Sequence, residues 1–337
     1  MQWPWQRGIK AHELLVFSLA QGRLHWLLAD RAGAQAVLMR RGCQDWPEGA
    51  PETALQALRK LGLRPGQAWA VLPMSGYQML QIEAPAVPPD ELRAASRWHI
   101  RDRIEAHLDD LTIDVLRVGP ARKPGSGQGQ LFVVAADNAE LQRVHALAQA
   151  AGWPLQVIDV ADLVQRNLHC AAARALDLGE RATACLMRQG EAALLTVCVG
   201  DELYYSRRLD WDSSLVERAS GAWPAGGPPA DDRSPALELG AGGDDAPRLV
   251  IELLRSFDVW ERSWPDLPLT MMLLDGEPAD SVAAGYLQDQ LGLRVLGLDS
   301  TAAFQLPPLA DTDANADRPA DWAPLLGALL RSTDRET

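Results

Sequence analysis

Two histidines in the first half of the chain, with two aspartates close to them, are of the residue types that bind metal ions. His99, Arg103 and His107 stand four residues apart, with Asp102 and Asp110 close to them. Imidazole and carboxylate groups bind zinc when several of them converge on one point. On a helix, residues eight positions apart are separated by about 12 Å along the axis, so these two imidazoles cannot reach the same ion. We interpret the pattern as a polar helical face and expect no metal site.

A histidine beside a cysteine is the second candidate for chemistry. His169 directly precedes Cys170 in a stretch with helical periodicity. A thiol nucleophile needs a base within hydrogen-bond reach, but consecutive residues of a helix point about 100° apart. The other cysteines, Cys43, Cys185 and Cys198, form no Cys-x-x-Cys pair. We therefore expect all four cysteines to be small buried residues of a reducing compartment.

The third candidate is an aromatic residue with basic neighbours. Trp98 lies between Arg97 and Arg101 in a segment that we expect to be helical. A lone aromatic on a helix usually packs inward, which favours a core position for Trp98. The alternative is that Trp98 forms the wall of a peptide groove. The arginines either give the helix a basic side or pair with acidic residues one turn away.

The composition is that of a globular protein and excludes several classes of partner. The chain has 337 residues, of which 47% are hydrophobic and 23% charged, and this length allows two domains. Its 45 acidic and 32 basic residues give a formal net charge of −13, which would repel nucleic acid. No apolar run reaches the roughly 18 residues that would span a bilayer. The first ten residues lack an apolar signal core, so we expect the protein to stay where it is made.

Hydrophobic periodicity and turn residues predict the elements that must position these side chains. The first half opens with an antiparallel meander. Its expected elements are strands over 12–19, 23–29 and 35–41, a helix over 53–61, strands over 68–73 and 77–84, a long helix over 90–108 and a strand over 112–118.

The stretch from Leu131 to Val164 predicts a parallel sheet at the centre of an α/β fold. Residues 131–136 are a continuous apolar run, typical of a strand that is buried on both faces. A helix to Gly152, a strand over 155–160 and a helix over 161–175 follow, which makes a βαβα unit. The second half repeats the plan, with strands over 182–199 and 202–208, a Gly/Pro/Asp-rich flexible segment over 221–247, a helix over 249–260, a strand over 269–274, a helix over 279–291, a strand over 293–298 and a helix over 323–330.

The order of these blocks resembles a known family. The chain is similar to the PilM family of actin-like proteins in type IV pilus machines, and most of all to its MshI branch in mannose-sensitive haemagglutinin (MSHA) pili. The cytoplasmic domain of GspL from type II secretion is a near relative of the same architecture. The resemblance rests on blocks that lie in the family's order and cover nearly the whole chain: ALQALRKLGLRPGQAWAVLP (54–73), IEAPAVPPDELRAASRWHIRDRI (82–104), residues 131–163, LYYSRRL (203–209), VIELLRSFDVWERSW (250–264), residues 271–295 and APLLGALLR (323–331).

The resemblance implies an α/β fold of the actin/hexokinase superfamily, PilM- and FtsA-like, in two domains. The first would span 1–160 with an inserted subdomain over about 68–118, and the second 161–337. It also implies a cytoplasmic protein, peripheral to the inner membrane, that holds the cytoplasmic tail of a PilN-like membrane protein beside the inserted subdomain. The implied partner-binding residues are Arg97, Trp98, Arg101 and Ile104 on the 90–108 helix.

Nucleotide-binding members of this superfamily hold phosphate with a DxG hairpin at the start of each half. The Gly allows the backbone to approach the phosphates and the Asp organises magnesium. The first half has no Asp before Asp30, and its early Gly8 has no acid two residues ahead. In the second half, Met187 and Gln189, or Arg188 and Gly190, occupy the DxG positions. The adenine-side turn is Asp275-Gly276-Glu277-Pro278, where Pro removes an N–H donor and Glu repels phosphate.

We therefore expect a non-enzymatic scaffold of an MSHA-type pilus assembly platform, without ATP hydrolysis and without a cofactor. Two alternatives stay open. One is a PilM-type ATPase with residual ATP binding, and the other is a GspL-like adaptor of type II secretion. Further assembly-platform proteins are the other expected partners.

Overall fold

The computed structural model describes most of the chain. The described residues are 10–33, 36–47, 51–119, 129–189, 191–211, 247–276, 281–298, 304 and 319–331. The segment predicted to be flexible, 221–247, lies outside this set except for its last residue. No described helix is long and apolar enough to cross a membrane.

A five-stranded sheet forms the base of the first half. Its order is β3-β2-β1-β4-β8, from strands β1 (Lys10–Ala20), β2 (Arg23–Asp30), β3 (Val37–Asp45), β4 (Pro65–Leu72) and β8 (Leu155–Val160). The meander β3-β2-β1 is antiparallel, as its sequence predicts, whereas β4 pairs in parallel with both β1 and β8.

Close packing fixes the meander. Trp26 on β2 is 1% exposed, and its ring lies where a Cβ on Gly42 of β3 would stand, 2.4 Å from the nearest ring atom. The Arg40 guanidinium covers the same ring at 5.7 Å from its centroid. A side chain at position 42 would therefore displace the largest apolar group of the sheet.

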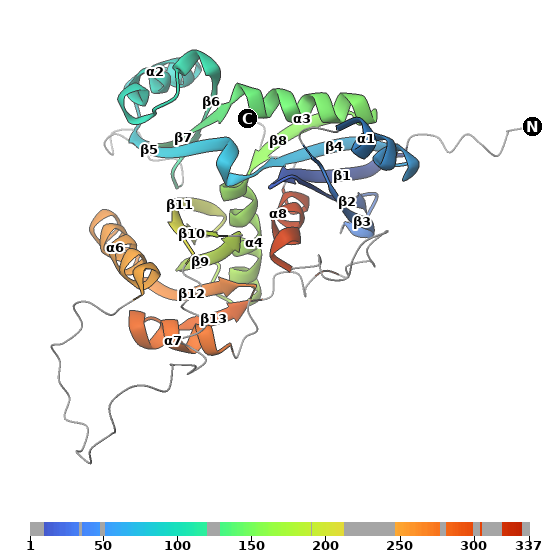
Figure 1. The fold of residues 1–337 in the computed structure, drawn as a ribbon. Helices are drawn as coiled ribbons and strands as arrows, with labels where there is room; N and C mark the ends of the chain where they lie inside the picture. The colour runs from blue at the N-terminus through green and yellow to red at the C-terminus, as the bar shows by residue number, and fades with distance from the viewer. Residues whose placement is uncertain are drawn as a thin grey trace, which may run out of the picture. The chain divides into compact units, whose positions relative to one another are not determined.

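Helices cover both faces of this sheet. Figure 1 shows α1 (Pro51–Lys60) and α3 (Asn138–Ala151) on one side and α8 (Pro319–Leu329) on the other. Helix α8 packs on β1, β2 and β4, and its Trp322 is fully buried with the His25 ring edge-on at 5.5 Å. At Gly327 an added Cβ would stand 2.2 Å from the carbonyl oxygen of Val164 in α4 (Ala161–Ala175), so the two helices touch through backbone.

A second five-stranded sheet repeats the order of the first. The sequence β11-β10-β9-β12-β13 consists of β9 (Ala182–Gln189), β10 (Ala192–Val199), β11 (Glu202–Asp210), β12 (Leu269–Asp275) and β13 (Val295–Leu298). Strands β9 and β10 are antiparallel, and β12 pairs in parallel with β9 and β13. Helices α6 (Arg248–Ser263) and α7 (Val282–Leu291) accompany it. The predicted duplication of the chain is therefore present in its sheets.

The chain divides into two compact units, which are described separately. The first contains residues 1–172, 201–204 and 300–337, and the second contains 173–200 and 205–299. The sequence-based halves were 1–160 and 161–337. The C-terminal helix α8 belongs with the first unit because its apolar face is buried on β1, β2 and β4.

A three-stranded antiparallel sheet forms a small subdomain of the first unit. Its order is β5-β7-β6, from β5 (Tyr77–Glu83), β6 (Leu111–Arg117) and β7 (Gln130–Asp137). Helix α2 (Leu92–His99) and short 3₁₀ turns at Met74–Gly76, Pro89–Glu91, Arg101–Arg103 and Leu108–Asp110 complete it. Its core consists of Ile82, Leu92, Ile100, Ile104, Leu111, Ile113, Leu131, Val133 and Ala135.

The prediction of one parallel βαβα unit over 131–164 was wrong for its first strand. Strand β7 pairs antiparallel with β5 and β6, while β8 lies in the five-stranded sheet beside β4. A continuous apolar run reports burial on both faces, but it carries no information about which strand lies alongside. The inserted subdomain was expected over about 68–118. Residues 68–72 instead belong to β4 of the five-stranded sheet, and the small sheet extends to Asp137 at the end of β7.

The predicted helix over 90–108 was also wrong in length. Helix α2 ends at His99, a 3₁₀ turn follows, and Ile104 is extended with φ −120° and ψ 131°. The apolar residues of this segment, Leu92, Ile100, Ile104 and Leu111, do face one core. They reach it through a turn and an extended segment, which a periodic pattern of apolar residues does not distinguish from a continued helix.

Candidate functional site

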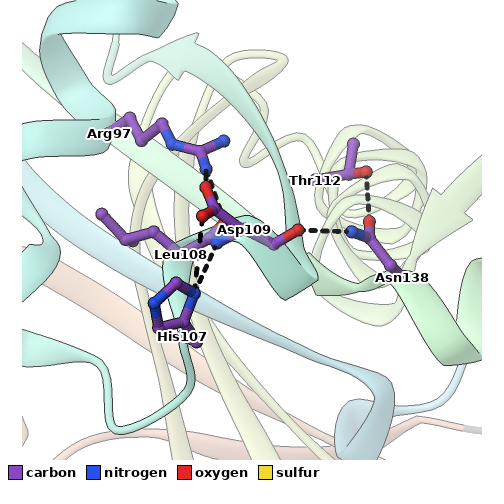
Figure 2. A network of polar contacts seen from close by, with 6 residues as sticks. All are labelled: Arg97, His107, Leu108, Asp109, Thr112 and Asn138. Carbon is purple, nitrogen blue, oxygen red and sulfur yellow. Dashed lines mark hydrogen bonds and ion pairs between the residues drawn. The ribbon is translucent and has the colours of Figure 1, made fainter.

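A polar network fixes the exposed end of α2 (Figure 2). The Arg97 Nη2 donates to the Leu108 carbonyl and to Asp109 Oδ1, both at 2.8 Å, and the Asp109 N–H donates to His107 Nδ1 at 3.4 Å. The Asn138 amide donates to the Asp109 carbonyl at 3.1 Å, which ties this turn to the first residue of α3. The network holds the α2 backbone, and with it the residues after Arg97, in one position.

Trp98 is on the surface, with 67% of its area exposed, so the prediction of a core position was wrong. The core-facing positions of α2 are Leu92 and Ser96, followed by Ile100 just after the helix. These residues are four apart and share one face, whereas a residue two positions from Ser96 is rotated by about 200°. A solvent-exposed Trp on a fixed helix is an unusual feature that suits contact with a partner.

The other predicted partner-binding residues separate into surface and core. Arg101 is exposed and forms no hydrogen bond or ion pair within the described residues. Ile104 is 7% exposed and belongs to the core of the subdomain, where it supports the surface from behind. We call Arg97, Trp98 and Arg101 the α2 surface.

The arginines pair across elements instead of along their own helix. Arg93 Nη2 meets Asp114 Oδ1 on β6 at 3.0 Å, and Arg97 meets Asp109. One of the two alternatives from the sequence was pairing with acidic residues one turn away, because a sequence without a fold offers only neighbours in the chain. The paired acids lie beyond the end of the helix, in residues that the three-stranded sheet brings back to it.

The two edges of the three-stranded sheet differ. On β6 the outward N–H of Val115 is bound by the carboxylate of Asp114 at 3.0 Å, and that carboxylate also holds Arg93. On β5 the Ala84 N–H points to Gly129 beside β7, so the alternate residues Met79 and Gln81 direct their backbone groups to the open edge. Arg103 Nη1 donates to the Gln81 carbonyl at 3.1 Å. The β6 edge is thus blocked by its own side chain, and among the described residues one side chain, that of Arg103, contacts an outward backbone group of the β5 edge.

The hairpin that opens the first half, where the resemblance predicts phosphate contacts, is the β1–β2 turn. Its turn residues Gln21 and Gly22 both have positive φ, at 51° and 71°, as a two-residue hairpin requires. Ser18 Oγ near this turn donates to the Val71 carbonyl at 2.8 Å. No carboxylate occurs in the sequence between Glu13 and Asp30, and Gly8, the glycine considered from the sequence, lies outside the described residues.

The second hairpin offers an apolar side chain where an acid would be needed. Met187 is 1% exposed, and Gln189 Nε2 approaches its sulfur at 3.9 Å. Gly190, at the turn, lies outside the described residues. In the predicted adenine-side turn, Gly276 has φ 89° and its N–H donates to the Leu298 carbonyl at 2.7 Å, which occupies that donor within β13. Glu277 and Pro278 lie outside the described residues.

The described side chains offer little for acid–base or metal chemistry. His169 is fully buried, and burial lowers its pKa to about 3, so the imidazole is neutral at pH 7. Its neighbour Cys170 is 4% exposed. Among the described residues, no group of three or more His, Cys, Asp and Glu side chains is placed to hold a metal ion.

No family model and no curated protein sequence matches the chain. Solved structures do match. The PilM–PilN type IV pilus biogenesis complex aligns with a TM-score of 0.65 at 18% identity, over 95% of this chain and 98% of that chain. The cytoplasmic domain of EpsL, an inner-membrane component of the Vibrio cholerae type II secretion system, aligns with a TM-score of 0.46 at 12% identity, over 95% and 96% of the two chains. A Bacteroides thetaiotaomicron protein with an actin-like ATPase fold aligns at 0.49 and 7% identity, over 86% and 91%.

The similarity to the PilM–PilN structure extends over nearly the full length of both chains, and its sequence identity is low enough that it establishes the fold alone. In this chain the fold contains two five-stranded sheets of the same strand order. The predicted α/β fold is confirmed: this chain has an actin-like fold with a small inserted sheet.

Proposed function

We propose that the protein is a non-enzymatic scaffold of a type IV pilus assembly platform, of the MSHA type, and that it binds the cytoplasmic tail of a PilN-like inner-membrane protein. The observation that carries this proposal is the full-length likeness to a structure of a PilM–PilN complex, at a TM-score of 0.65. The protein would then act in the cytoplasm, peripheral to the inner membrane through that partner and in contact with other platform proteins.

The three-stranded sheet supplies the recognition in this proposal. An extended tail would add to the open β5 edge through main-chain hydrogen bonds, because the β6 edge is blocked by Asp114. The α2 surface would contribute a second contact, in which Trp98 buries an apolar side chain and Arg101 meets a carboxylate. The exposure of Trp98 supports this role, since a residue with 67% of its area in water contributes little to folding.

One substitution separates binding from stability. Trp98→Ala should weaken the binding of the PilN-like protein's tail peptide at least about tenfold, or about 1.4 kcal/mol, as measured by fluorescence anisotropy. The melting temperature should stay within error, because Trp98 is exposed. Val282→Ala on α7, which removes a side chain that is 60% exposed, is the matched control and should leave tail binding unchanged.

The backbone contact is tested in the ligand. A tail peptide with alternate N-methylated residues cannot donate to the β5 edge and should lose binding, while methylation in the other register should be tolerated. If both methylated peptides bind as tightly as the parent, the strand-addition mechanism is wrong. If the tail of a secretion-system partner binds and the pilus tail does not, the GspL-like adaptor is the correct alternative.

The absence of catalysis is part of the proposal. Neither described hairpin segment carries an acid in the positions that would organise magnesium, and a buried Met187 stands in the second one. We expect no ATP hydrolysis and a dissociation constant for Mg-ATP weaker than about 100 μM, or about −5.5 kcal/mol. Isothermal titration calorimetry that gives a low-micromolar value would favour the residual ATP-binding alternative.

A further inference from the structure

A cavity of about 720 Å³ lies at the end of the first five-stranded sheet where β4 and β8 begin. Two helix ends form it. Helix α1 ends before Gly62, with φ 64°, and α3 ends before Gly152, with φ 72°. After each glycine the backbone turns sharply into the following strand, β4 or β8. The Ala68 N–H of β4 donates to the Pro154 carbonyl at 2.9 Å, which joins β4 to the turn before β8. The cavity is therefore built by the fold itself, from the same helix–glycine–strand connection used twice.

The floor of the cavity is apolar and recessed. Leu58, Leu63 and Trp153 line it and are at most 7% exposed, and Pro65 completes the wall. Trp153 is held from beneath by Phe17, at 5.2 Å between ring centroids. A ligand group that enters can bury apolar surface against this floor without any rearrangement of the sheet.

The rim of the cavity is basic on a strongly acidic protein. Arg59 and Arg64 line it, whereas no Asp or Glu does. Arg59 Nη2 donates to the Ala150 carbonyl at 2.9 Å, which stretches its guanidinium across the opening to α3. Arg64 forms no hydrogen bond or ion pair with any described residue. With a formal net charge of −13 on the chain, this concentration of positive charge beside an apolar floor is selective for an anionic ligand.

We propose that this cavity is a second docking site, for an acidic peptide segment of a partner protein that carries an apolar side chain. The apolar side chain would enter between Leu58, Leu63 and Trp153, and a neighbouring carboxylate would pair with Arg64 and with the free donors of Arg59. A membrane surface is the poorer fit, because bilayer binding needs apolar groups that protrude, and those of the cavity are recessed. The site lies apart from β5 and α2, and it does not depend on the proposed tail-binding function.

A peptide selection tests the class of ligand. A phage-displayed library of random twelve-residue peptides is selected on the full chain and, in parallel, on a double variant Arg64→Glu/Gln149→Trp. Gln149 is an exposed residue of the cavity rim, so a Trp there fills the opening from outside. We expect the wild-type selection to enrich peptides with two or more acidic residues beside a large apolar one, and the double variant to enrich none of them.

Synthetic peptides from that selection then give affinities by fluorescence anisotropy. Arg64→Glu and Gln149→Trp should each weaken binding at least about tenfold. Two matched controls should change it by less than about twofold: Arg294→Glu, an exposed arginine of the second unit, and Gln142→Trp, an exposed glutamine of α3 away from the cavity. All four positions are on the surface, so the variants should fold, which the melting temperature checks.

Four results would overturn the proposal. The enriched peptides could lack acidic residues, or they could bind the double variant as tightly as the wild type. Sedimentation with vesicles of 30% phosphatidylserine could show binding that Arg64→Glu abolishes, which would assign the cavity to lipid. Concentration-dependent dimerisation of the wild type that Gln149→Trp abolishes would assign it to a second copy of the chain.

Discussion

The two sheets of the first unit are built on different principles. The five-stranded sheet is covered by helices on both faces, and most residues of β2 and β4 and the middle of β1, Leu14–Phe17, are buried. The three-stranded sheet has one short helix and several turns over a core of aliphatic side chains, and its ion pairs are on the outside. The larger sheet recurs in the second unit with the same strand order, whereas the small sheet occurs once among the described strands.

This difference shows where a fold can specialise. A sheet that is covered on both faces has few groups left to offer a partner, because its backbone and side chains are already paired or packed. The small sheet retains an open strand edge, an exposed Trp and a cationic side chain that is held in position. The proposed tail binding follows the same division, with rigidity assigned to the large sheet and the tail contact to the small one, while the proposed second docking site uses the helix ends beside the large sheet and neither of its faces.

The largest expected effect lies in the large sheet. Trp26→Ala removes a side chain that is 1% exposed and leaves a cavity beside Gly42, so the free energy of unfolding should fall by about 3–5 kcal/mol. Trp98→Ala serves as the control, since the same substitution at an exposed site should cost under about 0.5 kcal/mol. Urea unfolding measures both. Equal losses at the two positions would remove the distinction between the sheets.

A smaller loss is expected in the core of the small sheet. Ile100→Ala removes a fully buried side chain just after α2 and should cost about 2–4 kcal/mol, while Ile100→Val should cost about 0.5–1.5 kcal/mol. Amide hydrogen exchange should show the loss in β5, β6 and β7 before it appears in β1 and β4. If protection falls equally in both sheets, the small sheet does not unfold as a separate unit.

These two sheets also mark what the sequence predicts well. The large sheets were recoverable because their meanders have short turns, such as Gln21-Gly22, which leave one pairing available to consecutive strands. Strand β7 was found but paired wrongly, since its partners β5 and β6 lie across long connections and burial alone does not choose between them. The exposure of Trp98 follows from its place two residues after the core-facing Ser96, which the general tendency of aromatic residues to pack inward does not report.

The candidate site was recoverable only in part, for a related reason. The sequence pointed to Arg97, Trp98 and Arg101. It did not show that Arg97 pairs with Asp109 or that Arg93 pairs with Asp114, because these ion pairs form through the fold. The cavity between α1 and α3 had a signal that was not used: each helix ends in Gly followed within three residues by Pro, at Gly62 and Gly152. The same connection twice in one unit places two similar turns at the same edge of a parallel pair.

Acid should weaken the large-sheet region through His169. Burial lowers the folded-state pKa to about 3 from 6.5, so the unfolded chain binds the proton more tightly between these values. The free energy of unfolding should therefore fall as pH drops below 6.5. The contribution of His169 to this fall is up to about 1.4 kcal/mol per pH unit. His169→Gln, which cannot ionise, should flatten the dependence of unfolding free energy on pH from 6 to 4. An unchanged slope would show that His169 does not carry the effect.

The smallest effect concerns the outer network of the small sheet. Arg97→Ala should cost only about 0.5–1 kcal/mol, because Asp109 is 80% exposed and the pair is screened by water. A double-mutant cycle with Asp109→Ala measures the coupling between the two, which should fall at high salt. The same variant should nonetheless increase the mobility of the Trp98 indole in NMR relaxation, since α2 loses its attachment to the 108–110 turn. A rigid indole in Arg97→Ala would mean that α2 is held by its apolar face alone.

The passage from β7 to α3 has a mechanical consequence. Asp137 is both the last residue of the strand and the cap of the helix, where its carboxylate accepts the Ala139 N–H at 2.7 Å, so no loop intervenes. Helix α3 then reaches β8 after a three-residue turn. A force applied to the small sheet would be transmitted through β7 and α3 to β8 in the large sheet, because no long loop lies between these elements. The continuous β7–α3 connection therefore couples the small sheet mechanically to the large sheet.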